Sequence, residues 1–99
     1  MARFRVYRLK EYDALAIDLQ SDFLEGLPSR VMAPLHNIEG MSWAISRLNP
    51  RVTVNGRTYV MATQRMASIP LSEIGAEVAD LSSRSDDITA ALDFLFQGF

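Results

Sequence analysis

The sequence contains no cysteine, which excludes disulfides, thiolate metal sites and a cysteine nucleophile. Its single histidine, His36, cannot build a metal site alone. No apolar run reaches the roughly 20 residues that a membrane-spanning helix requires, so we expect no membrane partner. A strand-like pattern begins at Arg3, and we therefore expect no signal peptide and a reduced, cytoplasmic protein.

Strong charge of either sign is also absent. Ten basic and 12 acidic residues give a net charge of -2, which argues against tight, direct binding of nucleic acid. Contact with DNA through a basic partner stays open. We interpret the locally basic N-terminal strand as a solvated face; its basic residues are Arg3, Arg5, Arg8 and Lys10.

The 99 residues are 48% hydrophobic and 22% charged, values that are ordinary for a globular protein. We therefore expect one domain over residues 1–99. Alternating apolar residues predict strands over residues 3–7, 15–19 and 31–35. Pro34 lies inside the third strand and cannot donate a ladder bond, so we predict an edge strand or a bulge there.

The middle of the chain carries one strong local signal. Asn55-Gly56 tolerates positive φ at both positions and predicts a type I′ hairpin within residues 52–61. Apolar spacing over residues 38–48 predicts a short helix, and residues 62–67 are expected to continue extended. Pro70 suggests a second edge-like strand, and residues 72–81 are ambiguous.

A terminal helix is predicted over residues 83–97. Ser83 or Ser85 can cap its first turn, and acidic residues there suit the positive end of the helix dipole. Gly98 is placed to end the helix in a left-handed conformation. One apolar stripe at helical spacing contains Ile88, Ala91, Leu92, Leu95 and Phe99.

Several apolar residues fall where a core cannot easily take them. The last six residues contain three aromatics, and we expect them to be buried in a partner or folded back. Phe94 lies off the stripe, which indicates a second buried face or else an exposed ring. Phe23 and Leu24 are adjacent in a loop, so at least one of them can sit at an interface.

No catalytic constellation is specific in this sequence. His36 is interpreted as a residue at a strand end rather than a catalytic base. Asp86 and Asp87 can be read as a metal pair, but adjacent carboxylates at a helix start are more often dipole partners. The glycines do not form a phosphate-cradling loop. We therefore expect a binding protein with no enzymatic activity, no metal and no cofactor.

The chain resembles the CcdB family, toxins of plasmid-addiction systems that poison DNA gyrase. The matching segments are residues 4–7, 18–22, 30–35, 63–71 and 74–81. The resemblance implies a mostly β, α+β fold: an SH3-like antiparallel β-barrel with a small additional sheet and a C-terminal helix. It also implies a homodimer whose two tails emerge side by side near the two-fold axis.

By resemblance, the protein is a type II toxin that binds the gyrase A subunit and traps the complex in which DNA is cleaved. Family contacts with gyrase carry over to the tail and to a surrounding patch: Gln97, Gly98, Phe99, Ser21, Phe23, Leu24 and Asp93. The best-known family tail is Trp-Gly-Ile, whereas here Gln97 and Phe99 flank Gly98. This departure leaves full activity, a shifted gyrase preference or a decayed toxin open.

The family toxin is neutralised by a CcdA-like antitoxin whose disordered segment folds on binding. The toxin then reaches operator DNA only through the antitoxin, as a corepressor. Antitoxin contacts are expected in the N-terminal strand and loop, at Tyr7, Arg8, Lys10 and Tyr12. Two alternatives remain: a MazF-type endoribonuclease toxin on the same barrel, and a decayed toxin that only binds antitoxin.

Overall fold

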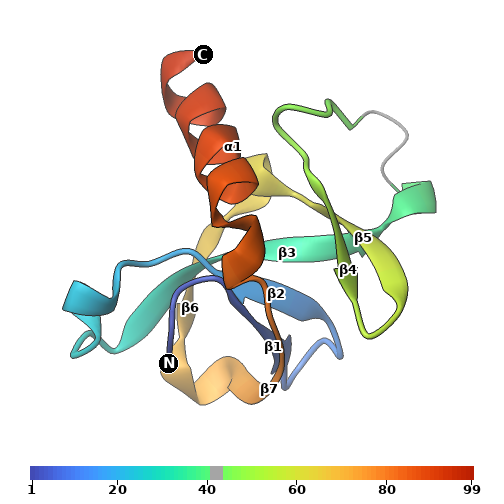
Figure 1. The fold of residues 1–99 in the computed structure, drawn as a ribbon. Helices are drawn as coiled ribbons and strands as arrows, with labels where there is room; N and C mark the ends of the chain where they lie inside the picture. The colour runs from blue at the N-terminus through green and yellow to red at the C-terminus, as the bar shows by residue number, and fades with distance from the viewer. Residues whose placement is uncertain (41–43) are drawn as a thin grey trace.

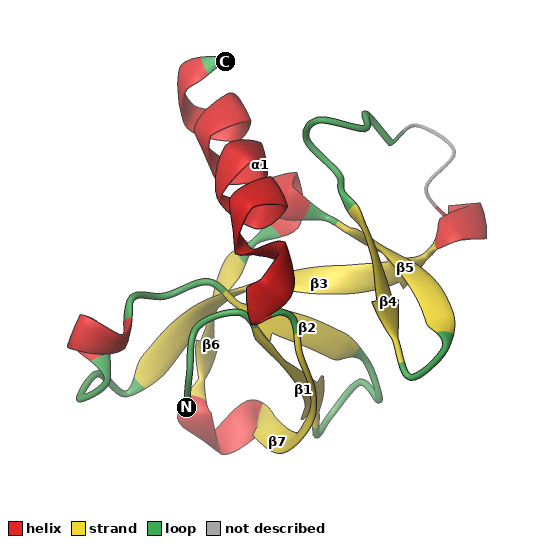
Figure 2. Cartoon of the chain, in the orientation of Figure 1, coloured by secondary structure: helices red, strands yellow, loops and turns green. Residues whose placement is uncertain are grey.

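Seven strands among the described residues form one curled, antiparallel sheet, and a helix stands on it (Figures 1 and 2). The structure is a computed structural model, and it describes residues 1–40 and 44–99. The strands are β1 (Arg5–Leu9), β2 (Leu15–Asp18), β3 (Ser29–Asn37), β4 (Arg51–Val54), β5 (Arg57–Met61), β6 (Ala67–Pro70) and β7 (Ile74–Asp80). The helix is α1 (Ser85–Gln97), and short 3-10 turns are η1 (Asp22–Leu24), η2 (Ile38–Gly40), η3 (Thr63–Arg65), η4 (Leu71–Glu73) and η5 (Ser82–Arg84).

Strand β3 is the centre of the sheet, not its edge. The strand order is β4-β5-β3-β2-β1-β7, and β6 also pairs with β3. β3 pairs with β2 on one side, whereas on the other side β6 pairs with its first half and β5 with its last three residues. The expected additional small sheet corresponds to β4, β5 and this end of β3, and it is continuous with the rest.

The prediction of an edge or bulge at Pro34 was therefore wrong. The carbonyl of Pro34 accepts the amide of Ala62 at 2.9 Å, just after β5 ends and before β6 begins. Pro34 thus lies between the part of β3 that pairs with β6 and the part that pairs with β5. No ladder bond needs its missing N–H there, so a proline is tolerated in a central strand. Pro70, by contrast, closes β6, which among residues 1–40 and 44–99 pairs with β3 alone, as the edge prediction expected.

Strand β2 is buried on both faces, which explains why its sequence alternates so weakly. Ile17 belongs to the larger hydrophobic cluster under α1, and Ala16 to a smaller cluster on the opposite face. The larger cluster also contains Val6, Leu35 and the helix residue Ile88. The helix therefore closes one side of the sheet.

Local predictions were confirmed where turn residues determine the backbone conformation and were wrong where tertiary packing determines it. Asn55 and Gly56 have φ values of 51° and 82°, which confirms the hairpin between β4 and β5. The expected helix over residues 38–48 was wrong in its described part: η2 is one turn, residues 44–50 are loop, and Met41 lies outside the described residues. Residues 63–65 form η3 rather than extended chain.

Helix α1 begins at Ser85, directly after η5, so its N-cap residue is Arg84 and no side chain caps it. The predicted serine cap was wrong because Ser83 lies inside the preceding turn and Ser85 is already the first residue of α1. Asp86 and Asp87 do lie in the first turn. Gly98 ends the helix at φ 81°, and its amide donates to the Phe94 carbonyl at 3.0 Å, as predicted.

Gly98→Ala is expected to destabilise the last turn of α1 by about 1–2 kcal/mol, because an L residue is strained in the left-handed region. A Cβ at Gly98 would meet nothing within 4 Å, so the effect is conformational only. The measurement is loss of helical Cα chemical shifts over residues 94–97. Gly26→Ala, which is equally unobstructed and has no positive φ, should leave these shifts unchanged. If the Cα chemical shifts of residues 94–97 were the same in both variants, the expected strain of an L residue at position 98 would be contradicted.

Candidate functional site

The end of α1 projects away from the sheet (Figure 1). The residues there include exposed aromatic rings. Phe96 is 71% exposed and Phe99 is 75% exposed. Gln97 and Gly98 are exposed as well. The expected apolar stripe is buried only at Ile88 and Ala91, half-buried at Leu92 and Leu95, and exposed at Phe99. Residues 96–99 are therefore available as a contact surface.

Phe94 packs on a second face of α1, as its position off the apolar stripe indicated. Its ring is half-buried, and the guanidinium carbon of Arg47 lies 4.6 Å from the ring centroid. This is the distance of a cation–π contact. Arg47 comes from the loop before β4, so this loop braces the outer half of α1.

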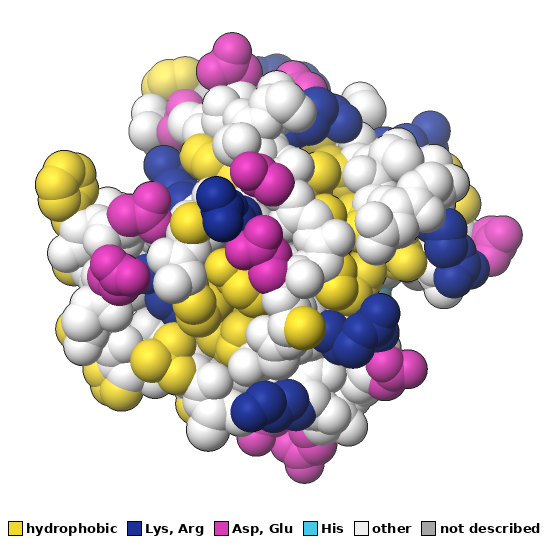
Figure 3. All heavy atoms as spheres, turned by 60° about the horizontal axis from the view of Figure 1, so that its bottom comes forward, with side chains coloured by type: hydrophobic (Ala, Val, Ile, Leu, Met, Phe, Trp, Pro, Cys, Tyr) yellow, Lys and Arg dark blue, Asp and Glu magenta, His cyan; other side chains and the backbone are white. Residues whose placement is uncertain are grey.

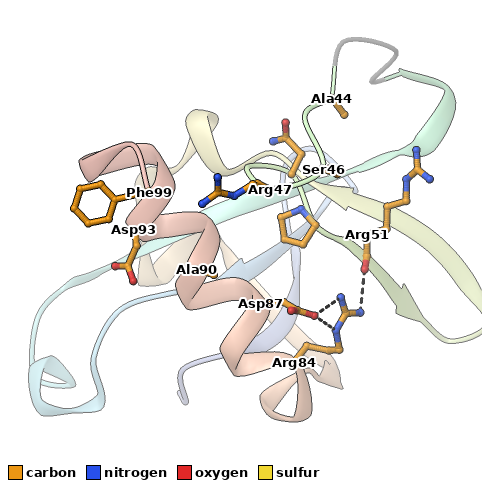
Figure 4. Close-up of a pocket in the computed structure, with 11 residues that line it drawn as sticks. Ala44, Ser46, Arg47, Arg51, Arg84, Asp87, Ala90, Asp93 and Phe99 are labelled. Atoms are coloured by element: carbon orange, nitrogen blue, oxygen red, sulfur yellow. Dashed lines mark hydrogen bonds and ion pairs between the residues drawn. The ribbon is translucent and has the colours of Figure 1, made fainter.

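A groove of about 760 Å³ lies between α1 and the segment of residues 44–51 (Figure 4). Arg47, Arg51 and Arg84 line it together with Asp87, Asp93 and Phe99 of the helix side, and Arg51 turns its backbone carbonyl rather than its guanidinium toward Arg84 (Figure 4). Arg84 donates to the Asp87 carboxylate at 3.0 Å and to the backbone carbonyl of Arg51 at 2.9 Å. These bonds tie the start of α1 to β4.

A second apolar surface lies at η1. Phe23 is 100% exposed, Leu24 is 48% exposed and Leu27 is 46% exposed. The hydroxyl of Ser21 accepts the amide of Phe23 at 3.2 Å and caps the turn. Figure 3 shows hydrophobic side chains at the left edge of the molecule, the side where Figure 1 places η1. We call residues Phe23, Leu24 and Leu27 the η1 patch.

A buried ion pair lies directly behind the η1 patch. Arg30 and Asp18 are each 0% exposed, and Arg30 Nη2 lies 2.7 Å from Asp18 Oδ2. The same nitrogen donates to the Gln20 carbonyl at 3.0 Å and reaches Asp22 Oδ1 at 3.5 Å. Burial lowers the pKa of Arg30, but the hydrogen bond and charge of Asp18, followed by those of Asp22, outweigh it and raise the pKa. Arg30 is therefore a permanent buried cation.

Gln20 extends this network along the backbone. Its side-chain nitrogen donates to the carbonyls of Leu24 and Ser29, both at 3.3 Å. Its side-chain oxygen accepts the amide of Val31 at 3.0 Å. The backbone amide of Gln20 in turn donates to Asp18 Oδ1 at 3.0 Å. One side chain thus joins both ends of the loop that carries η1.

The predicted gyrase contacts fall into two separate groups. Asp93 and Gln97 lie on the outer part of α1, and Gly98 and Phe99 follow it directly. Ser21, Phe23 and Leu24 belong to η1 and its N-cap. Figure 1 shows the C-terminal end of α1 and η1 at different sides of the molecule. One protomer therefore presents two surfaces rather than one continuous patch.

The predicted antitoxin contacts also differ among themselves. Arg8, Lys10 and Tyr12 are exposed, and Tyr12 reaches 75%. Arg8 Nη1 pairs with Asp13 Oδ1 at 2.8 Å. Tyr7 is only 6% exposed, and its hydroxyl accepts the Ala2 amide at 3.2 Å. Tyr7 therefore supports this segment from the core side.

The residues considered for metal or catalytic roles are dispersed. Within residues 1–40 and 44–99, no three His, Cys, Asp or Glu side chains group so that they could hold a metal ion. Asp87 pairs with Arg84 instead. His36 lies within β3, where burial and the nearby charge of Arg65 lower its pKa. In the same part of the chain, no helix has the length and apolar character needed to cross a membrane.

Sequence reasoning missed Arg30, Gln20 and Arg47. Charged and amide side chains are mostly exposed, so a single sequence gives no reason to place Arg30 or Gln20 inside. The one available signal is Asp18, an acidic residue that follows three apolar ones in β2. Arg47 precedes α1 by some 40 residues, and only the fold brings it to Phe94.

In the part of the chain that the structure describes, these features define a mostly β protein with one α-helix and two exposed apolar segments, of the kind that mark protein interfaces. Comparison with protein families makes the assignment specific. The family model of the CcdB protein matches residues 3–98, and the chain belongs to the CcdB family. Its members are toxins of toxin–antitoxin systems that act on DNA gyrase.

Proposed function

We propose that this protein binds the gyrase A subunit and holds gyrase in the state in which DNA is cleaved. The observation that carries the proposal is the exposed aromatic segment on a firmly seated helix. Phe96 and Phe99 stay 71% and 75% exposed, whereas Ile88 and Ala91 anchor the same helix in the core. Large aromatic side chains presented in this way are typical anchors of an interface.

The proposed mechanism needs no chemistry from the toxin. A ligand that binds the cleaved, open form of gyrase better than the closed form shifts the population toward the cleaved form. Bonds within the protein hold the anchor in place: the left-handed cap at Gly98 and the Arg47 contact with Phe94 fix the end of α1. A preorganised segment loses less conformational entropy on binding.

We infer that a homodimer presents the gyrase-binding surface. The tail and the η1 patch lie on different sides of one protomer, so a two-fold assembly offers a way to bring surfaces of two copies together. The partner, a dimer of A subunits, has the same symmetry. The test is light scattering across a concentration series, where a mass that stays near the monomer's 11.1 kDa would contradict the dimer.

We propose that a CcdA-like antitoxin neutralises the toxin and carries it to operator DNA as a corepressor. The exposed side chains Arg8, Lys10 and Tyr12 provide a cationic and aromatic surface for a disordered segment that folds on binding. The net charge of -2 supports a role for the antitoxin in DNA contact. Both partners, and the toxin itself, belong to the cytoplasm in this proposal.

The experiment is a gyrase cleavage assay. Purified protein, gyrase A and B subunits, ATP and supercoiled plasmid are incubated, and the reaction is stopped with detergent and protease. Linear DNA above the toxin-free control is the expected result. Its absence with gyrase from the same host would contradict poisoning and support a decayed toxin. Cleavage of RNA by the protein alone would support the ribonuclease alternative.

A further inference from the structure

The η1 turn has a regular 3-10 conformation although it buries none of its own residues. Its central residue, Phe23, is 100% exposed, so core packing cannot fix the direction of this ring. The turn has a single cap, the Ser21 hydroxyl, and a short 3-10 turn has weak hydrogen bonds. Another part of the molecule must therefore hold η1 in position.

The Arg30 network is placed to do this. Arg30 Nη2 reaches the backbone of Gln20 just before η1 and the carboxylate of Asp22 within it. Asp22 also accepts the backbone amide of Arg3 at 2.9 Å. Gln20 binds the carbonyl of Leu24 at the other end of the turn. Every one of these bonds ends on η1 or on a residue that borders its loop.

A buried ion pair is a weak source of stability, because desolvation offsets its Coulomb attraction. Here one guanidinium nitrogen, Nη1 of Arg30, is also buried without a partner among the described residues. An apolar pair would fill the same space without these costs. The polar pair instead selects one conformation of the loop, because its hydrogen bonds are satisfied in that conformation alone.

We propose that Arg30, held by Asp18, is a positioning residue that holds the start of η1 through Asp22 and so fixes the orientation of Phe23 for gyrase, while Gln20 holds the end of the turn through the Leu24 carbonyl. The inference rests on the proposed function for its gyrase part only. The ordering of η1 can be measured in the free protein. A preorganised turn loses less entropy on binding, so loosening it should weaken gyrase binding about tenfold.

Asp22→Ala tests the proposal without disturbing the buried pair, because the Asp22 side chain is 62% exposed. The matched control is Glu77→Ala, which removes an exposed carboxylate that pairs with Arg5 at 3.2 Å on β7. The first readout is the backbone order parameter of the Phe23 and Leu24 amides by nitrogen relaxation. We expect values near 0.85 in the unaltered protein and in Glu77→Ala, and below about 0.6 in Asp22→Ala. Unchanged order in Asp22→Ala would overturn the proposal.

The second readout is binding to the gyrase A subunit, measured by calorimetry for Asp22→Ala, Phe23→Ala and the double variant. Asp22→Ala should weaken binding on its own but add nothing in the Phe23→Ala background, because it acts through that ring. The positioning role would be overturned if the losses of gyrase affinity were additive in the double variant. It would also be overturned if Asp22→Ala lowered the order parameters of η1 but left the affinity unchanged. If the unaltered protein binds no gyrase, the proposed function fails, and the order parameters still decide whether the network holds η1.

Discussion

Deletion of residues 97–99 is expected to abolish gyrase-dependent linear DNA while leaving the fold intact. Phe99 is 75% exposed and Gln97 and Gly98 are exposed, so the segment contributes little to the core. A buried aromatic anchor at an interface is worth about 2 kcal/mol or more, which corresponds to a loss of roughly 30-fold. Phe99→Ala alone should therefore show a loss of this size in the cleavage assay.

The deletion is compared with Leu71→Ala, which removes an exposed apolar side chain, 42% accessible, from η4. This control should retain full cleavage activity and its thermal midpoint, and the deletion variant should keep a cooperative thermal transition that is lowered only by loss of the Gly98 cap. If the deletion variant still produced linear DNA, the gyrase contact would lie outside the tail. The η1 patch would then be the first surface to alter.

Arg30→Met is expected to lower the free energy of unfolding by about 3–5 kcal/mol, far more than the loss of a surface ion pair. The substitution leaves the Asp18 carboxylate buried at 0% exposure without its cation. It also removes the hydrogen bond to the Gln20 carbonyl at 3.0 Å. The measurement is the free energy of unfolding by urea.

Arg5→Met provides the comparison at the surface. Arg5 pairs with Glu77 at 3.2 Å, but both side chains are about two-fifths exposed and the pair is screened by water. Its removal should leave the urea midpoint nearly unchanged. The double variant Arg30→Met with Asp18→Leu should recover most of the lost stability, because both charges are then gone. A small loss for Arg30→Met would show that the buried pair relaxes toward solvent.

The sequence was most informative where neighbouring residues decide the structure. Asn55-Gly56 specified its hairpin because few other residues accept two positive φ angles in succession. Gly98 specified the end of α1 for the same kind of reason. The tail was predicted to be buried in a partner or folded back onto the domain; Phe96 and Phe99 are not folded back, and burial in a partner stays a prediction.

The remaining features depend on contacts between distant segments. Pro34 predicts an edge strand from the sequence alone, because the sequence does not show that β5 and β6 share one side of β3. Arg30 reads as a surface residue until β2 places Asp18 beside it. The separation of η1 from the tail follows from the fold alone, so residues joined in one predicted patch lie on two surfaces.

The pairing of β1 with β7 also sets when the protein can fold during its synthesis. β1 lies at Arg5–Leu9, but its second neighbour is Ile74–Asp80, and the core is closed by Ile88 and Ala91 of α1. A ribosome adding about 5–20 residues per second needs roughly 4–15 s to pass from β2 to Ala91. Throughout that interval the nascent chain lacks the helix that covers its core. The protein can therefore acquire its native surfaces only after α1 has left the ribosome.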